Sequence, residues 1–536
     1  MPRTLRPGAA AYAERVPPER PLLPLWAAVP SSLAGGLALT LAFPEHSWWP
    51  MVFVAVPLAL LSLIGRSAWG AVLVGFVFGL AFFLVNVSFT ARYLGPVPWL
   101  ALSFLEAALT AVAAVPITWA YRWLPRVSSA TWVRLILLPL LVSGLWTMRD
   151  LWLGSWPYGG FPWGRIGVTQ ATSPLAPVAS WVGMTGLGFL IVLLCAVAVE
   201  YVRIRRFRDL RMLVPGVALA LVLVLVPQFP TAQAGSIRVG SVQGNGPTGY
   251  FDERTRNEVL SAQLTATGPL LDERMDVLLW PEGGIDSDPT SNAATATVLD
   301  RLARRLNAPL LVNAVTARAD QYFNTSMLWR AGEGPTQTYD KIHPVPFGEY
   351  VPDRWFFEAL APDLIGLIQR EYSPGTSLPT FDVNGVAVGL AICFDVIYDD
   401  VIWAGANAGA EVYMFQTNNA DFRGTDENLQ QLAFARMRAI ETGRAVVNLS
   451  TVGTSEVIAS DGSVLDALTA GEAGTMLTDV PLHTGLTPAV VLGPWIQLLL
   501  GWGSLIVIAI VGVSARRVAR RAQQTAPPPE GDGAAG

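Results

Sequence analysis

Apolar and polar positions divide this chain into a part suited to a membrane and a part suited to water. Seven apolar runs come first, a mostly polar segment of mixed charge covers about 233–484, and one more apolar run follows. Runs of roughly 17–25 apolar residues are long enough to cross a bilayer as helices. The pattern predicts eight transmembrane helices, at about 24–43, 48–65, 68–90, 99–121, 134–152, 175–202, 212–230 and 488–514.

These boundaries predict five segments in chain order. We expect a polar leader, a bundle made of spans one to seven, a soluble domain, an eighth span, and a disordered tail rich in Pro and Gly. Their predicted limits are 1–23, 24–232, 233–484, 485–515 and 516–536.

The polar segment alternates between strand-like and helix-like patterns. Continuous apolar stretches such as 275–282 and 386–395 are typical of buried strands, and the amphipathic stretches 295–307 and 427–444 are typical of helices. Strands that are apolar on both faces need other layers over each face. The alternation therefore predicts an α/β sandwich as the core of the soluble domain.

Composition agrees with this division and excludes several classes of function. Of the 536 residues, 52% are hydrophobic and 14% are charged, which is too apolar for a soluble protein. The net charge of -5 comes without a long basic block, so we expect no nucleic-acid partner. Cys195 lies in an apolar run, so we expect no disulfide with Cys393; the three scattered histidines give no support to a metal site, and we expect no cofactor.

The arginines orient the predicted spans. They cluster in the leader and in every second loop, whereas the alternate loops hold only Arg92, Arg149 and Arg165. Positively charged loops stay on the cytoplasmic side. This alternation predicts that both termini are cytoplasmic and that 233–484 lies outside the cytoplasm.

Three residues of the soluble segment carry candidate chemistry. Glu282 closes the strand-like stretch LLWPE, Cys393 closes GLAIC, and Lys341 is the only lysine in the chain. Functional residues gather at strand ends in α/β folds. A thiolate can attack a carbonyl, a carboxylate can take and return its proton, and an ammonium can stabilise the oxyanion. Together they suffice for acyl transfer through a thioester.

Each of the three also has an ordinary structural interpretation. A cysteine that ends a buried strand is often a small core residue. A Pro-Glu after a strand is often a turn, and a lysine in a loop is often solvated. Chance explains each residue singly, but not the set together with the sequence around it.

The flanking sequence resembles the carbon–nitrogen hydrolase (nitrilase) superfamily, and within it the membrane-bound apolipoprotein N-acyltransferase family. The blocks that carry the resemblance are VLLWPEGGI, YDKIHPVPFGEYVP, GLAICFD, and RMRAIETGRAVV with Gly453 and Ser455 after it. The resemblance covers about 25–510. It implies an α-β-β-α sandwich on a base of eight membrane helices, with Glu282 as general base, Lys341 as electrostatic stabiliser and Cys393 as nucleophile.

The resemblance also implies supporting roles for five further residues, which support the site or contact substrate: Glu349, Trp280, Phe394, Asp395 and Tyr350. Here the sequence departs from the family, because Cys-Phe-Asp stands where Cys-Tyr-Glu is common. Phe394 lacks the hydroxyl of Tyr, and Asp395 is one methylene shorter than Glu, which puts hydrogen bonds from these two side chains in question. The block TNNADFRG also departs from the usual Thr-Asn-Asp-x-Trp-Phe, so acceptor or lipid preference is expected to differ.

The implied reaction moves an acyl chain from a membrane phospholipid, through a Cys393 thioester, to the α-amino group of a lipoprotein's diacylglyceryl-cysteine. The implied setting is the bacterial plasma (inner) membrane, with the catalytic domain on the extracytoplasmic (periplasmic) face and a monomeric protein. Two alternatives stay open at this point. One is a membrane-tethered amidase of the nitrilase type; the other is a non-catalytic, lipoprotein-binding scaffold.

Three features of the sequence allow two interpretations each. Glu106, inside the fourth apolar run, is either functional or neutralised within the bundle. The Trp-, Gly- and Pro-rich loop 152–173 is either an interfacial belt or a substrate portal. The apolar stretches 355–357 and 364–368 form either a lid that dips into lipid or an ordinary packed helix pair.

Overall fold

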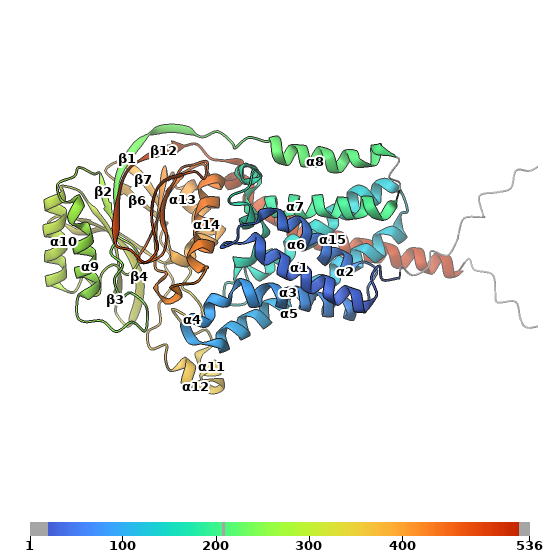
Figure 1. Ribbon diagram of the computed structural model, residues 1–536, viewed down its shortest axis with the longest axis horizontal. Coiled ribbons are helices and arrows are strands. Elements are labelled where there is room, and N and C mark those ends of the chain that lie inside the picture. The colour runs from blue at the N-terminus through green and yellow to red at the C-terminus, as the bar shows by residue number, and fades with distance from the viewer. Residues whose placement is uncertain (1–19, 206–208, 525–536) are drawn as a thin grey trace, which may run out of the picture.

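The computed structural model describes residues 20–205 and 209–524, and places a helical bundle at one end and an α/β domain at the other (Figure 1). The bundle holds eight apolar helices in the described residues, with a π-helical turn at Val133–Leu137 before the fifth. They are α1 (Leu25–Ala42), α2 (Val52–Leu63), α3 (Ala68–Asn86), α5 (Pro96–Val127), α6 (Leu138–Leu153), α7 (Ala179–Ile204), α8 (Val214–Leu225) and α15 (Pro488–Gln524).

These helices fall where the apolar runs predicted spans. Six of them are long and apolar enough to cross a membrane, among the described residues. The second and seventh are shorter, and cover Trp49–Leu63 and Leu210–Leu225 when their leading turns are included. The prediction of about eight spans is consistent with this arrangement, and the fifth, which ends in charge, forms a helix as expected.

The α/β domain contains two six-stranded sheets. In the first sheet the order is β12-β1-β2-β3-β4-β5, and in the second it is β11-β10-β9-β8-β7-β6. The strands of the first are β1 (Ala232–Gln243), β2 (Val277–Leu279), β3 (Leu310–Arg318), β4 (Gln321–Arg330), β5 (Gly334–Asp340) and β12 (Gly474–Thr484). Those of the second are β6 (Thr380–Val383), β7 (Val386–Ile392), β8 (Val412–Thr417), β9 (Ala445–Ser450), β10 (Ser455–Ile458) and β11 (Val464–Leu468).

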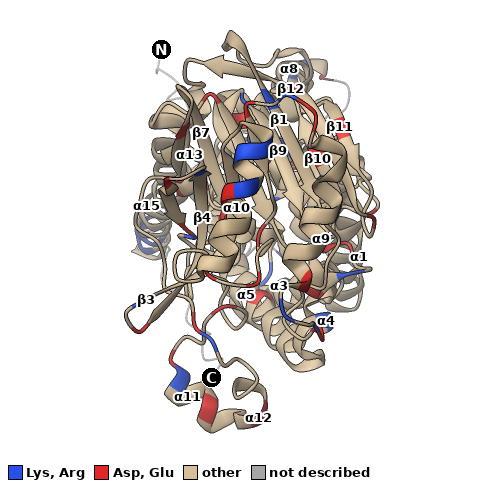
Figure 2. Cartoon of the chain, turned by 90° about the vertical axis from the view of Figure 1, so that its left-hand side faces the viewer, with Lys and Arg blue, Asp and Glu red and all other residues tan. Residues whose placement is uncertain are grey.

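Helices cover the outer face of each sheet, which gives the predicted α-β-β-α order. Apolar side chains of both sheets, such as Val239 and Leu390, form the core between them. Helices α9 (Glu258–Thr267) and α10 (Ala293–Leu306) pack on the first sheet. Figure 2 shows the charged residues of α10 on its outward side, and Leu299, which faces the sheet, is fully buried.

The helices on the second sheet join the domain to the bundle. They are α13 (Asp399–Asn407) and α14 (Glu427–Thr442), and α14 contacts α7 and α15. Their apolar residues belong to the same core as the bundle helices; Phe434 and Ile402 are examples. The second sheet, which carries Cys393 at the end of β7, is therefore held in a fixed position relative to the bundle helices.

Two short helices form an arm beside the bundle. They are α11 (Arg354–Leu360) and α12 (Pro362–Ile365), which lie near α4 (Ala91–Leu94) in Figure 1. Ile365 is buried in a small cluster that includes Leu94, whereas Trp355 is 77% exposed and Leu360 is 71% exposed. The arm is thus packed on one side and apolar on its open side, and a lid function for it stays a prediction.

Candidate active site

The three candidate residues come together from the ends of three strands. Glu282 follows β2, Lys341 follows β5 directly, and Cys393 follows β7. Glu282 and Lys341 belong to the first sheet and Cys393 to the second, so the site lies where the two sheets face each other. The spacing along the chain could not show this meeting, because it depends on how the sheets stack.

Lys341 lies between two carboxylates. Its Nζ is 2.8 Å from Glu349 Oε2 and 3.6 Å from Glu282 Oε1, and the residue is 2% exposed. Burial acts to lower the pKa of Lys341, but the charges of Glu349 and Glu282 outweigh it and raise the pKa well above its ordinary value. Lys341 is therefore a fixed positive charge inside the site.

A pair of asparagines positions these carboxylates, and sequence reasoning missed both. Asn324 Nδ2 donates to Glu282 Oε1 at 2.6 Å and to Glu349 Oε1 at 3.1 Å. Its Oδ1 accepts from Asn313 Nδ2 at 2.8 Å, which orients the amide. Both are buried polar residues in apolar strands, β3 and β4. Such residues need partners, and that was the signal available in the sequence.

Glu282 has the properties of a general base. Burial raises its pKa to about 7, against the opposing effect of Lys341. Its Oε1 is held by Asn324, whereas Oε2 is buried and has no hydrogen-bond partner among the described residues. One oxygen is thus anchored, and the other is available for a proton from Cys393, whose pKa the charge of Glu282 raises.

Cys393 occupies a sharp turn between β7 and a short 3₁₀ helix, Cys393–Ile397. Its φ of 48° lies in the left-handed region, which costs a non-glycine residue roughly 1–3 kcal/mol, and such strain often occurs at active sites. The side chain is half-buried, and Sγ accepts a hydrogen bond from Gln431 Nε2 at 3.3 Å. Burial, followed by the charge of Glu282, raises the pKa of the thiol well above its ordinary value, so it needs a base to ionise.

Asp395 ties the cysteine turn to the lysine loop. Its carboxylate accepts hydrogen bonds from the Tyr339 hydroxyl at 2.8 Å, the His343 N–H at 2.9 Å and the Ile392 N–H at 3.2 Å. Asp395 is one methylene shorter than the Glu common at this position, yet its carboxylate still accepts these three hydrogen bonds. Phe394, which lacks the hydroxyl, stacks on Phe161 of the bundle with ring centroids 5.9 Å apart.

Two of the residues predicted to support the site, Trp280 and Tyr350, make structural hydrogen bonds around it. Trp280 is fully buried behind the site, where its indole N–H donates to Thr267 Oγ1 at 3.2 Å and its carbonyl accepts from Gln416 at 2.6 Å. It therefore fixes the turn that carries Glu282. The backbone carbonyl of Tyr350 accepts a hydrogen bond from the Phe347 N–H at 2.7 Å, which closes the turn that carries Glu349.

The loop 152–173 and α14 connect the site to the bundle. Trp163 is buried and its indole N–H donates to Gln430 Oε1. Gln430 Nε2 donates in turn to the carbonyls of Pro44 and Asn86, at 3.2 Å each. Trp163 thus packs against the α/β domain, whereas Trp156 of the same loop is exposed, and the belt and the portal both stay predictions. Gln431, which contacts Cys393, is the next residue along α14.

Glu106 lies in the bundle and is 2% exposed, with Oε2 lacking a hydrogen-bond partner in the described part of the chain. It faces the bundle interior, as the structural interpretation expected, and a functional role for it stays a prediction.

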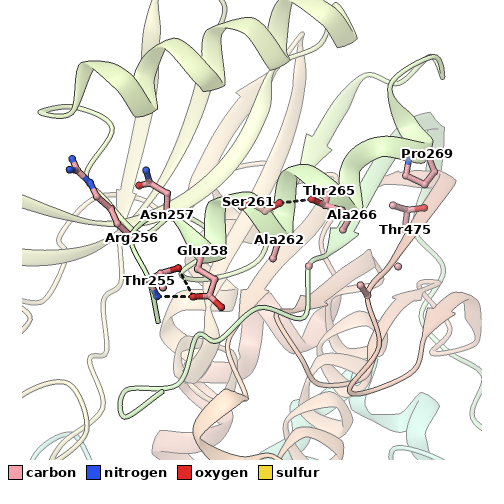
Figure 3. Close-up of a pocket in the computed structure, with 13 residues that line it drawn as sticks. Thr255, Arg256, Asn257, Glu258, Ser261, Ala262, Thr265, Ala266, Pro269 and Thr475 are labelled. Atoms are coloured by element: carbon pink, nitrogen blue, oxygen red, sulfur yellow. Dashed lines mark hydrogen bonds between the residues drawn. The ribbon is translucent and has the colours of Figure 1, made fainter. Parts of the chain in front are cut away.

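The hollow in Figure 3 is a different place from this site. It is an open groove of about 770 Å³ beside α9, and none of the site residues described above lines it. Its lining comes from α9, the turn before it and β12, and includes Thr255, Glu258, Thr265 and Thr475.

An α-β-β-α sandwich with Glu, Lys and Cys at its centre, carried on apolar helices, defines a membrane-bound protein of the carbon–nitrogen hydrolase class. Family models agree: residues 35–197 match the apolipoprotein N-acyltransferase N-terminal domain, and residues 238–485 match the carbon–nitrogen hydrolase domain. The chain belongs to the apolipoprotein N-acyltransferase family.

Individual relatives span most of the chain. An apolipoprotein N-acyltransferase of Mycolicibacterium smegmatis is 33% identical over 92% of this chain and 87% of its own length. An apolipoprotein N-acyltransferase of Photobacterium profundum is 27% identical over 86% of this chain and 90% of its own length. Among solved structures, an amidase from Nesterenkonia sp. is 19% identical with a TM-score of 0.36, over 47% of this chain and 93% of that one.

Proposed function

We propose that this protein is an apolipoprotein N-acyltransferase that works through a thioester on Cys393. The observation that carries the proposal is the meeting of Glu282, Lys341 and Cys393 in one buried site next to the bundle. The donor is a membrane phospholipid and the acceptor is the N-terminal diacylglyceryl-cysteine of a lipoprotein. Family membership supports both substrate classes.

The first half-reaction loads the enzyme. Glu282 takes the proton of Cys393, and the thiolate attacks the ester carbonyl carbon of the phospholipid. A C–S bond forms and the C–O bond breaks. Glu282 then returns the proton to the departing oxygen, so that a lysophospholipid leaves and a thioacyl enzyme remains.

Lys341 stabilises negative charge during this step. Its ammonium is held by Glu349, so it needs no rearrangement when the oxyanion develops. Backbone N–H groups near Phe394 supply the remaining donors. The second half-reaction uses the same groups when the acceptor amine attacks the thioester.

The membrane explains the architecture. Both substrates carry acyl chains, and each buried methylene contributes about 0.8 kcal/mol to membrane binding. The reacting carbonyl lies near the headgroups, so a site at the face of the bundle meets it. We place the α/β domain on the extracytoplasmic side of the bacterial plasma membrane, with both termini in the cytoplasm, because arginines cluster in every second loop. We expect a monomer.

The decisive experiment uses the two cysteines as a matched pair. Purified protein is mixed with an alkyne-tagged phospholipid, and the acyl adduct is located by mass spectrometry. Cys393→Ala should lose the adduct and all transfer to a diacylated lipopeptide. Cys195→Ala, which alters a buried residue of α7, should keep both. Full activity of Cys393→Ala would overturn the proposal.

The same assay separates the two alternatives. A membrane-tethered amidase would release ammonia from a small amide and ignore phospholipid. A scaffold would bind lipoprotein normally after loss of Glu282, Lys341 or Cys393.

A further inference from the structure

The second half-reaction of the proposed function, on which this inference rests, releases one proton more than Glu282 returns to the sulfur. An α-amino group has an ordinary pKa of about 7.7–8.0, so the acceptor arrives largely as an ammonium with three protons. The amide product keeps one of them. A second proton goes to the sulfur of Cys393 through Glu282. The third needs another acceptor.

Glu427, the first residue of α14, is a further buried carboxyl group beside the nucleophile. The residue is 3% exposed, and its Oε2 accepts a hydrogen bond from Asn419 Nδ2 at 2.8 Å. The same nitrogen donates to Gln431 Oε1 at 2.8 Å, and Gln431 donates to Cys393 Sγ at 3.3 Å. Two amide side chains thus connect Glu427 to the sulfur.

The charges that act on Glu427 are negative. Burial has the largest effect on the pKa of Glu427 and raises it. The hydrogen bond from Asn419 acts to lower that pKa, the charges of Glu282 and Asp421 raise it further, and the pKa rises to about 8. The site's lysine, Lys341, is already engaged by Glu349 at 2.8 Å and lies 3.6 Å from Glu282. A cation brought next to Glu427 would favour its ionised, proton-accepting form, because it offsets the charges of Glu282 and Asp421.

We infer that Glu427 forms an ammonium-binding subsite, which holds the acceptor's α-amino group beside the thioester and takes one proton from it. A carboxyl group whose proton affinity matches that of the amine exchanges the proton at little cost in free energy. Glu282 and Glu427 then have separate tasks: Glu282 serves the sulfur in both half-reactions, and Glu427 serves the amine in the second.

The second half-reaction balances with these two groups. Glu427 takes the first proton of the ammonium, and the free amine attacks the thioester carbonyl to form the C–N bond. Glu282 takes a second proton from that nitrogen. The C–S bond breaks, and Glu282 gives its proton to the departing thiolate. Glu427 finally releases its proton to water, which restores the enzyme.

The test separates the two half-reactions in the full-length protein. Thioester formation is measured with a phospholipid donor, and its consumption is measured with two nucleophiles: a diacylated lipopeptide and hydroxylamine, which is uncharged at neutral pH. Glu427→Gln should load at the wild-type rate and react normally with hydroxylamine. It should transfer to the lipopeptide at least about 100-fold more slowly, the range of a lost general base.

Two further variants complete the design. Glu427→Asp keeps the carboxyl group and should retain transfer to the lipopeptide within about 10-fold. Glu258→Gln changes the first residue of α9, a half-buried glutamate away from the candidate site, and should leave every rate unchanged.

Three results would overturn the subsite: wild-type lipopeptide transfer by Glu427→Gln, equal slowing with both nucleophiles, or loss of loading in that variant. If the wild-type protein forms no thioester at all, the proposed function fails and this inference fails with it. Normal loading with unimpaired transfer by Glu427→Gln would remove only the subsite.

Discussion

The guanidinium of Arg165 lies 2.7 Å from the carboxylate of Asp399, at the boundary between the bundle and the α/β domain. Asp399 also accepts from Arg438 at 2.7 Å, and Arg438 donates to Glu441 at 2.6 Å. Burial acts to raise the pKa of Asp399, but the two arginines outweigh it and hold the pKa at about 2. The ion pair of Arg165 and Asp399 therefore stays charged at all working pH values, and it joins the bundle to the α/β domain.

Removing one member of this pair should destabilise the contact between the two parts. Because it leaves Asp399 buried with only part of its counter-charge, Arg165→Gln should lower stability by about 3 kcal/mol. The exposed pair of Arg305 and Asp272 offers a control, and Arg305→Gln should cost less than about 1 kcal/mol. Thermal unfolding in detergent measures both, and equal unfolding temperatures would contradict the prediction.

The rate of thioester formation should rise with pH up to about 7. Glu282 must be unprotonated to take the proton of Cys393, and burial raises its pKa to about 7. Asn324 donates to Glu282 and thereby lowers that pKa, so Asn324→Ala should move the rise to higher pH. Single-turnover loading between pH 5 and 9 tests this prediction, and the rate of Asn324→Ala should fall about 10-fold at neutral pH.

The control variant is Asn384→Gly, at an exposed turn with φ 55°, which should leave the pH profile unchanged. An unmoved profile in Asn324→Ala would contradict the assignment of Glu282 as the base.

Lys341→Arg should abolish thioester formation while the protein remains folded in the membrane. The ammonium sits within 2.8 Å of Glu349 in a position that is 2% exposed, and the larger planar guanidinium does not fit the same point. Arg301→Lys, an exposed exchange on α10, is the control. Mass spectrometry of Cys393 and membrane extraction measure the two properties, and a normally loading Lys341→Arg protein would return this lysine to a structural role.

The arm formed by α11 and α12 should matter only when the substrate is in a bilayer. Trp355 and Leu360 are largely exposed, whereas Phe357 packs on Phe347 with ring centroids 4.8 Å apart. Replacing Trp355 and Leu360 together with Ser should slow turnover in lipid vesicles several-fold, because apolar contact with lipid is lost. A short-chain donor in detergent should be used at the normal rate. Val464→Ser, on edge strand β11, is the control, and equal losses in both media would contradict a lipid contact.

Hydrophobic patterning was sufficient to predict most of the fold. Apolar runs of bilayer length marked the spans, since a helix in lipid must be apolar over its whole length. Alternating strands and helices predicted the sandwich, and the structure confirms it. Element ends were less exact: α10 runs from Ala293 to Leu306, although the amphipathic pattern covered 295–307. Turns at helix ends depend on local capping, which hydrophobicity does not encode.

The sequence by itself determined which residues carry the candidate chemistry. A lone lysine, a Pro-Glu after an apolar strand and a cysteine at the end of another are visible without coordinates, and their flanking blocks identified the family. Only the tertiary structure decided that Asn324 bridges Glu282 and Glu349, that Gln431 contacts Cys393, and that Glu427 lies beside them. These residues come from separate strands and from α14, and contacts between distant segments arise when the two sheets and the bundle pack against one another, which no local pattern records.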